Sequence, residues 1–140
     1  MRKISIIIAL LVMSSNLLFS LGLKEKENKI LEIIEEKSFF NDFKVIDEKV
    51  LIECKITIKN NSDKNLSFKI NAVFEDDVNL GLLKYKTLEG YKNDLINNIF
   101  TISANEIIEY CQIIFIGESA GNYQKANRNL PKEINIILLE

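Results

Sequence analysis

The feature that most constrains the fold is an apolar alternation over residues 50–74. In its first half the apolar residues recur at every second position: Val50, Ile52, Cys54, Ile56 and Ile58. A period of two is typical of a β-strand with one buried face. The polar segment 60–65 interrupts the alternation, which then resumes from Leu66 to Phe74. This pattern predicts a hairpin that forms one wall of a β-sheet, with one face on a core and the other in water.

Three later segments also predict strands. Residues 100–102 and 107–116 are separated by a predicted turn at residues 103–106, and residues 134–138 alternate again. The segment 107–116 is apolar on both faces, which is typical of a central strand that is covered on both sides. Residues 75–81 predict a turn, and residues 86–98 fit either a loop or a short helix.

The segment 25–37 follows a different period. Ile30, Ile33, Ile34 and Lys37 lie at i, i+3, i+4 and i+7, and charged residues occupy the opposite side. This spacing predicts an amphipathic helix. Because acids match or exceed bases along it, we expect the helix to pack on the domain and not on a membrane surface. The predicted organisation is therefore a helix and linker over residues 23–41, followed by a β-sandwich domain over residues 42–140.

The first 22 residues have the composition of a secretory signal peptide. Arg2 and Lys3 precede an apolar run over residues 4–12, and residues 20–22 have the small-x-small form of a cleavage site. We expect cleavage near Gly22 and an exported protein that is periplasmic, attached to the cell surface or secreted. The alternative is an uncleaved membrane anchor. Polar residues at positions 14–16 argue against it, because a spanning helix needs about 20 mostly apolar residues.

The composition excludes several classes of function. The chain has a net charge of −2 and no basic run with interleaved aromatic residues, so we expect no nucleic-acid partner. It contains no histidine, which excludes Ser-His-Asp and Cys-His catalysis. Its two cysteines cannot by themselves supply a structural zinc site, and no phosphate-binding glycine motif occurs. We therefore predict no catalytic residues, no cofactor and no metal.

Acidic residues are densest at Glu75, Asp76 and Asp77. One interpretation is a carboxylate pair or, with Asn79, a calcium site, since calcium prefers clustered oxygen ligands. The spacing lacks the glycine and the distal glutamate of an EF-hand, so an acidic turn is the favoured interpretation. A hydrolase with two catalytic carboxylates would need acids that are distant in sequence, such as Asp76 and Asp94, to meet in a cleft.

Cys54 and Cys111 are the two cysteines of the chain. An even number of cysteines in an exported protein permits a disulfide. The alternative is two small buried hydrophobic residues that stay reduced. The sequence leaves both alternatives open, because spacing alone cannot place two Cα atoms within about 7 Å of each other.

The polar segment 117–131 is the predicted recognition loop. Functional residues concentrate on loops that a rigid scaffold holds in place, and Tyr and Arg are frequent interface anchors. The candidate partner-binding residues are Tyr123, Lys125, Asn127, Arg128 and Asn129. The alternative is a solvated connection in which Arg128 pairs locally and Leu130 packs into the core.

The strand pattern predicts a mainly β protein with an immunoglobulin-like antiparallel β-sandwich and one N-terminal helix. The segments IECKITIKNNSDKNLSFKINAVFEDD and FTISANEIIEYCQIIF resemble small extracytoplasmic bacterial modules of the FxLYD type. Asn60 or Asn61 matches the end of the first strand of those modules, and Phe74 with Asp76 matches their Phe-x-Asp. The FxLYD signature is absent, and the usual glycine is replaced near Glu53 or Cys54.

The resemblance covers about half of the chain and implies an immunoglobulin-like accessory domain without catalytic residues. Together with the signal segment, it favours an exported, non-enzymatic protein that binds another envelope protein or a surface component. Contact with a membrane is expected only through an uncleaved N-terminal segment. The alternatives are a small two-carboxylate hydrolase of envelope glycans and an immunity or inhibitor protein of the envelope.

Overall fold

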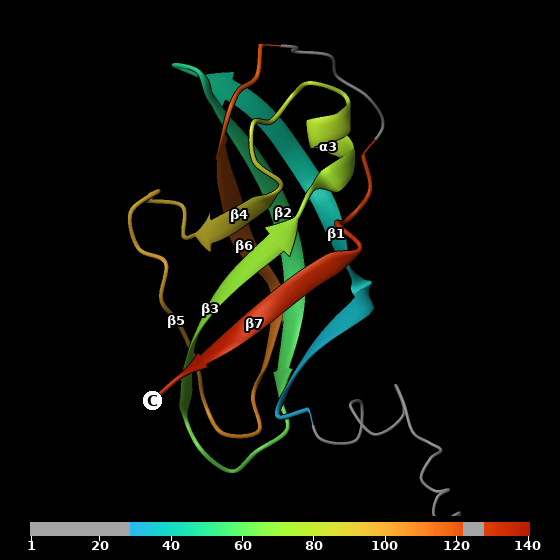
Figure 1. Ribbon diagram of the computed structural model, residues 1–140. Helices are drawn as coiled ribbons and strands as arrows, with labels where there is room; N and C mark the ends of the chain where they lie inside the picture. The colour runs from blue at the N-terminus through green and yellow to red at the C-terminus, as the bar shows by residue number, and fades with distance from the viewer. Residues whose placement is uncertain (1–28, 122–127) are drawn as a thin grey trace, which may run out of the picture. The chain divides into compact units, whose positions relative to one another are not determined.

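The computed structural model describes residues 29–121 and 128–140, which are mainly β (Figure 1). The described strands are β1 (Leu31–Ile46), β2 (Lys49–Asn60), β3 (Leu66–Val73), β4 (Thr87–Tyr91), β5 (Phe100–Ile102), β6 (Ile107–Glu118) and β7 (Glu133–Leu139). The helix α3 spans Glu75–Asn79. All strand pairs between these elements are antiparallel. The predicted class, a mainly β chain with an antiparallel sheet, is therefore confirmed.

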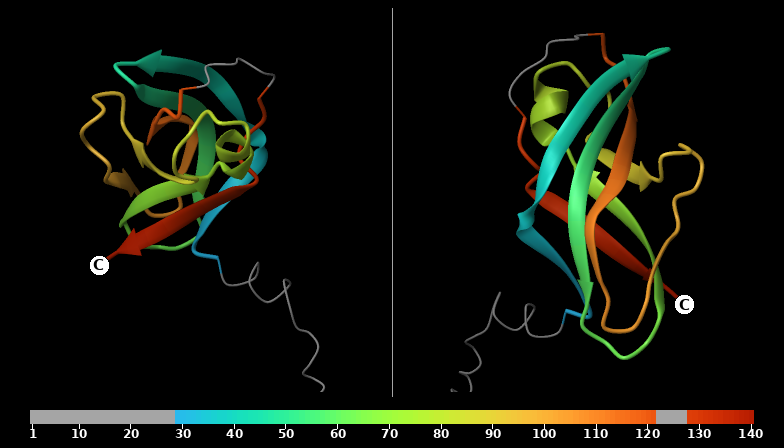
Figure 2. Two further views of the ribbon diagram at one scale, coloured as in Figure 1. Left: turned by 45° about the horizontal axis from the view of Figure 1, so that its top comes forward. Right: turned by 180° about the vertical axis from the view of Figure 1, so that it is seen from behind.

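The strands form one curled sheet with the order β1-β2-β6-β4-β3, and both β5 and β7 pair with β3. β4 joins the two halves, because it pairs with β6 through Glu89–Tyr91 and with β3 through residues 87–89. Figures 1 and 2 show β3 and β7 lying across β2 and β6, on opposite sides of the core. The sheet thus folds over its own apolar face.

The core lies between these two halves. β2 contributes Val50, Ile52, Cys54, Ile56 and Ile58, which are all buried as the alternation predicts. Apolar residues of β3 and β6 pack against them in the same cluster. Aromatic rings join the layers, with the Phe74 and Phe115 ring centroids 5.4 Å apart.

Gly90 allows β4 to approach both halves of the sheet. A Cβ atom at this position would lie 2.6 Å from the Ile113 Cγ2 atom and 2.9 Å from the Ile70 Cγ2 atom. Both neighbours are fully buried. Close packing of this kind explains a glycine within a strand, where it otherwise weakens the structure.

The predicted hairpin is wrong in its pairing, although both of its strands exist. β2 pairs with β1 and β6, so both of its edges are occupied, and β3 pairs with β4, β5 and β7. The segment after Asn60 is a crossover between the halves of the sheet. The buried Asn60 side chain holds it, because its Nδ2 donates to the Lys64 and Ser103 carbonyls at 2.8 and 2.9 Å.

The predicted N-terminal helix is also wrong from Leu31 onward, because residues 31–41 belong to β1 and hence to the sheet. Leu31 and Ile33 pair with Asn60 and Ile58 as ordinary strand residues. A register shift between Ile34 and Phe39 then adds extra residues to β1 and interrupts the strand period at residues 35–38. Lys29 and Ile30 are not helical either, and the rest of the predicted helix, residues 25–28, lies outside the described residues.

Other segments differ less from the sequence predictions. The strands at residues 100–102, 107–116 and 134–138 are confirmed as parts of β5, β6 and β7. The predicted turn at residues 75–81 contains α3, and residues 87–91 form β4 where a loop or a helix was expected. β6 is central, as predicted, but its start is open to solvent at Ile107 and Tyr110.

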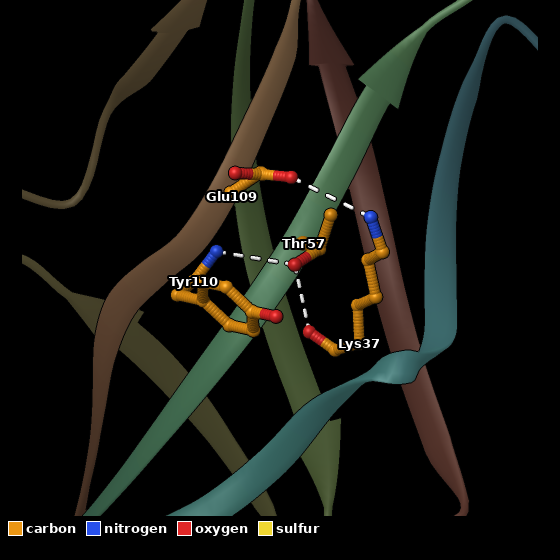
Figure 3. Close-up of polar contacts among 4 residues, drawn as sticks. All are labelled: Lys37, Thr57, Glu109 and Tyr110. Atoms are coloured by element: carbon orange, nitrogen blue, oxygen red, sulfur yellow. Dashed lines mark hydrogen bonds and ion pairs between the residues drawn. The ribbon is translucent and has the colours of Figure 1, made fainter.

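Thr57 joins β2 to both of its neighbours at the points where their ladders are interrupted (Figure 3). Its Oγ1 donates to the Lys37 carbonyl at 2.7 Å and accepts from the Tyr110 N–H at 3.1 Å. Its own N–H donates to Ser38 Oγ at 3.0 Å. Thr57 is fully buried, so these bonds satisfy its own hydroxyl and N–H, which water does not reach.

Tyr110 is the strained member of this group. Its φ is 56°, in the left-handed region that bulky residues rarely adopt. Such a conformation persists only where surrounding contacts determine it. The hydrogen bond to Thr57 is one of those contacts. A second is the exposed ion pair between Lys37 and Glu109, the residue before Tyr110, at 3.5 Å.

We expect Thr57→Val to lower the free energy of unfolding by about 1–3 kcal/mol, because it removes the hydroxyl but keeps the shape. The Tyr110 N–H and the Lys37 carbonyl would then lose their partner. Urea unfolding measures the change. Thr101→Val, at an exposed position of β5, is the matched control. Equal losses in the two variants would contradict the role given to Thr57.

Candidate functional site

A pocket of about 520 Å³ opens between α3 and residues 128–133. Buried apolar side chains line its interior, and they include Ile52, Phe74 and Leu82. The lining also includes charged residues, of which Glu75, Asp76, Lys132 and Glu133 are exposed and form the rim, whereas Asp77 and Arg128 are shielded from water. Figure 1 shows α3 beside the segment that leads into β7. The pocket thus combines an apolar interior with a mainly acidic rim.

An ion pair between Asp77 and Arg128 connects the two walls of the pocket. Arg128 Nη2 lies 2.6 Å from Asp77 Oδ1, and each side chain is only 11% exposed. The Arg128 guanidinium also lies 4.7 Å from the centroid of the Phe43 ring, a cation–π distance. Because the pair is largely shielded from water, loss of either side chain would leave the other charge uncompensated. The pair therefore ties the chain before β7 to α3.

Backbone contacts hold Asp77 from the other side. Its carbonyl accepts hydrogen bonds from the N–H groups of Leu82 and Leu83, at 2.9 and 3.2 Å. Leu82 and Leu83 are themselves buried in the core. The position of the Asp77 backbone is consequently set by the core. Arg128 Nε is buried as well, and no hydrogen-bond partner for it lies among the described residues.

Two of the five predicted recognition residues line the pocket. They are Arg128 and Asn129, and Asn129 is exposed at the rim. The other three, Tyr123, Lys125 and Asn127, lie outside the described residues. Leu130 packs against the core, as the alternative interpretation expected. Arg128 does not pair locally, because its partner Asp77 belongs to a distant segment.

The acidic cluster divides into two kinds of carboxylate. Asp77 is paired with Arg128, whereas Glu75 and Asp76 are exposed on the rim. Within residues 29–121 and 128–140, no group of three potential metal-ligating side chains occurs. The lining of the pocket includes Asp76 but not Asp94.

Asp94 lies in the loop that follows β4, where its carboxylate accepts hydrogen bonds from backbone groups. The N–H groups of Asn97 and Ile96 donate to its Oδ1 at 2.8 and 2.9 Å. These bonds, with that from Asn97 first, lower the pKa of Asp94. A general acid needs a raised pKa, so the environment of Asp94 suits a structural turn.

Cys54 and Cys111 are free thiols in the structure. They lie on the neighbouring strands β2 and β6, but Cys54 is opposite Ile113 and Cys111 is opposite Ile56. This diagonal placement separates side chains by about 7–8 Å, which does not suit a disulfide. Burial, with a further contribution from Glu53, raises the pKa of Cys54 to about 12, and burial also raises the pKa of Cys111. Both thiols therefore stay protonated near neutral pH and are poor nucleophiles.

Sequence reasoning missed the apolar interior of the pocket and the Asp77–Arg128 pair. Phe40, which lines the pocket, fell in the segment assigned to a helix and linker. Asp77 and Arg128 were both noticed, but no local pattern indicates that they meet. Their pairing depends on the curled sheet, which brings α3 and the start of β7 together.

We compared the chain with protein-family models, with curated proteins and with solved structures, and found no match in any of the three. In the described part of the chain, no helix has the length and apolar character needed to cross a membrane. The candidate site is accordingly defined by its own geometry.

We expect a double-mutant cycle to detect the Asp77–Arg128 pair. Arg128→Met leaves the Asp77 carboxylate uncompensated and should lower the free energy of unfolding by about 3 kcal/mol. Combined with Asp77→Asn, the cycle should give a coupling energy of about 1–3 kcal/mol in chemical denaturation.

The exposed pair Lys37–Glu109 provides the control for this cycle, because both of its side chains are more than half exposed. Lys37→Met with Glu109→Gln should give a coupling energy below about 1 kcal/mol. Coupling energies of the same size in the two cycles would contradict a special role for Asp77 and Arg128.

Proposed function

We propose that this chain is an exported, non-enzymatic binding protein of a bacterial envelope. Its pocket between α3 and residues 128–133 receives part of another envelope protein or of a surface component. The observation that carries the proposal is the pocket itself, with its apolar interior and its charged rim. This combination is typical of recognition sites, where apolar contact supplies affinity and polar groups at the rim supply specificity.

Preorganisation of the pocket supports the same function. The Asp77–Arg128 pair holds one wall against the other, and the buried Leu82 and Leu83 hold the Asp77 backbone. A site that is already ordered loses less conformational entropy when it binds. The rim retains exposed groups, such as Asp76 and Asn129, that are available to a partner.

The proposal includes an immunoglobulin-like sandwich for the domain. Its support is the curled sheet, in which β3 and β7 face β2 and β6 across one core. The resemblance of residues 52–77 and 100–115 to FxLYD-type modules agrees with it. Modules of that kind act as accessory domains, which fits a binding function.

The alternatives receive less support. A two-carboxylate hydrolase was expected to bring Asp76 and Asp94 together, but Asp94 does not line the pocket and has a lowered pKa. An envelope immunity or inhibitor protein would use the same binding surface, and the identity of the captured partner separates it from an accessory protein.

Export is tested by the intact mass of the protein from its native host, alkylated after denaturation without reductant. We expect a mass that lacks about the first 22 residues and carries two alkyl groups, because both cysteines are free thiols. A full-length mass would contradict cleavage and favour the anchor. A mass without alkyl groups would contradict the reduced state of Cys54 and Cys111.

Binding at the pocket is tested by site-specific photo-crosslinking in the host. A photoreactive amino acid at Asn129, on the rim, should give a defined covalent adduct that mass spectrometry identifies. The matched control is Asn93, which is exposed in the loop after β4 and does not line the pocket. The yield of this adduct should fall when Glu75 and Asp76 are both changed to Lys. Equal adduct yields at Asn129 and Asn93, or no adduct at Asn129, would contradict the proposal.

A further inference from the structure

β7 is an open edge of the sheet. It pairs with β3 in an unbroken register over seven residues, from Glu133 to Leu139. No other strand among the described residues pairs with it. In an antiparallel ladder, every second residue directs its N–H and C=O away from the paired strand. β7 therefore presents a row of backbone donors and acceptors on its free side.

This edge lacks the features that usually prevent strands from associating. Residues 134–139 contain no charge and no proline, and their pairing with β3 shows no register shift. Two other described strands are outer: β5, which has only three residues, and β1, which differs from β7 in regularity and in charge. It has two register shifts and carries several charges, among them Lys37, Asp42 and Lys44. Bulges and charges protect an edge, so β1 is protected and β7 is not.

Apolar side chains accompany the free backbone of β7. Ile137 is 46% exposed on one side of the strand, and Leu138 is 42% exposed on the other. An exposed, regular and apolar edge strand is the usual template for pairing with another chain. The remaining question is which chain fits it.

We propose that β7 pairs with β7 of a second copy of this chain, antiparallel and around a two-fold axis at Ile136. A two-fold interface brings the same patch of both copies together. With Ile136 opposite itself, all seven residues of the strand find a partner, and Ile134 lies opposite the Leu138 of the second copy. The sheet then continues across the dimer.

Charge complementarity selects the same register. When Ile136 is opposite itself, Lys132 lies opposite the Glu140 of the second copy, and the symmetry repeats this pair. Both residues are exposed and flank the uncharged segment 134–139. Opposite charges on directly facing positions stabilise strand pairs, whereas like charges destabilise them. A second copy therefore matches this edge in length, in apolar pattern and in charge.

The proposal does not depend on the function given to the pocket, because it concerns the free edge of β7 and is tested by mass. Sedimentation of the full chain across a dilution series should show a reversible twofold increase in mass at high concentration. Ile137→Glu should raise the dimer dissociation constant by about a hundredfold, because it places a charge in the interface. Within one copy the new carboxylate lies opposite Lys69, which favours a folded variant.

Ile96→Glu is the matched control, since Ile96 is 81% exposed in the loop after β4. It should leave the dissociation constant unchanged. A chain that stays monomeric throughout the series would overturn the proposal, and so would a dimer that Ile137→Glu does not weaken. Association with other host proteins but not with itself would overturn the assignment to a second copy.

A charge exchange tests the register without touching the apolar residues. Lys132→Glu alone and Glu140→Lys alone should each raise the dimer dissociation constant by about fivefold to tenfold, because each creates two like-charge contacts. The double variant should restore the original value. Failure of the double variant to recover would overturn the register centred on Ile136.

Discussion

The hydrogen bonds of Thr57 are the interaction on which the longer half of the sheet depends. β2 is the central strand of this half, and both of its ladders are interrupted near Thr57. One hydroxyl serves both interruptions, through the Lys37 carbonyl on one side and the Tyr110 N–H on the other. Without it, the Lys37 carbonyl and the Tyr110 N–H would lose this partner, at a cost of about 1–3 kcal/mol, which is a large share of the stability of a small domain.

The other half of the sheet is attached by close packing and by an ion pair. Gly90 lets β4 lie against both halves, and the Asp77–Arg128 bond draws the start of β7 toward α3. The pocket and the open edge of β7 follow from this arrangement, because the curled sheet leaves β1 and β7 unpaired with each other. The two proposals concern adjoining surfaces that share Lys132 and Glu133: the pocket for a partner, and the edge for a second copy.

Local patterns predicted the strands better than their partners. The alternation in β2 correctly indicated the buried residues from Val50 to Ile58. It also suggested a hairpin with β3, which is wrong because β1 and β6 occupy both edges of β2. The helix expected over residues 25–37 failed for a related reason. The bulge in β1 disturbed the period of two, and strand pairing overrode the local helical spacing.

The sequence by itself determined the fold class, most of the strand segments and the lack of histidine chemistry, since these depend on local period and on composition. It also indicated Arg128, Asn129 and the acidic cluster as residues of interest. Only the tertiary structure decided that Asp77 meets Arg128, that the two thiols lie diagonally and that β7 remains an open edge. The physical reason is that an alternating strand specifies which face is buried but not which strand lies beside it.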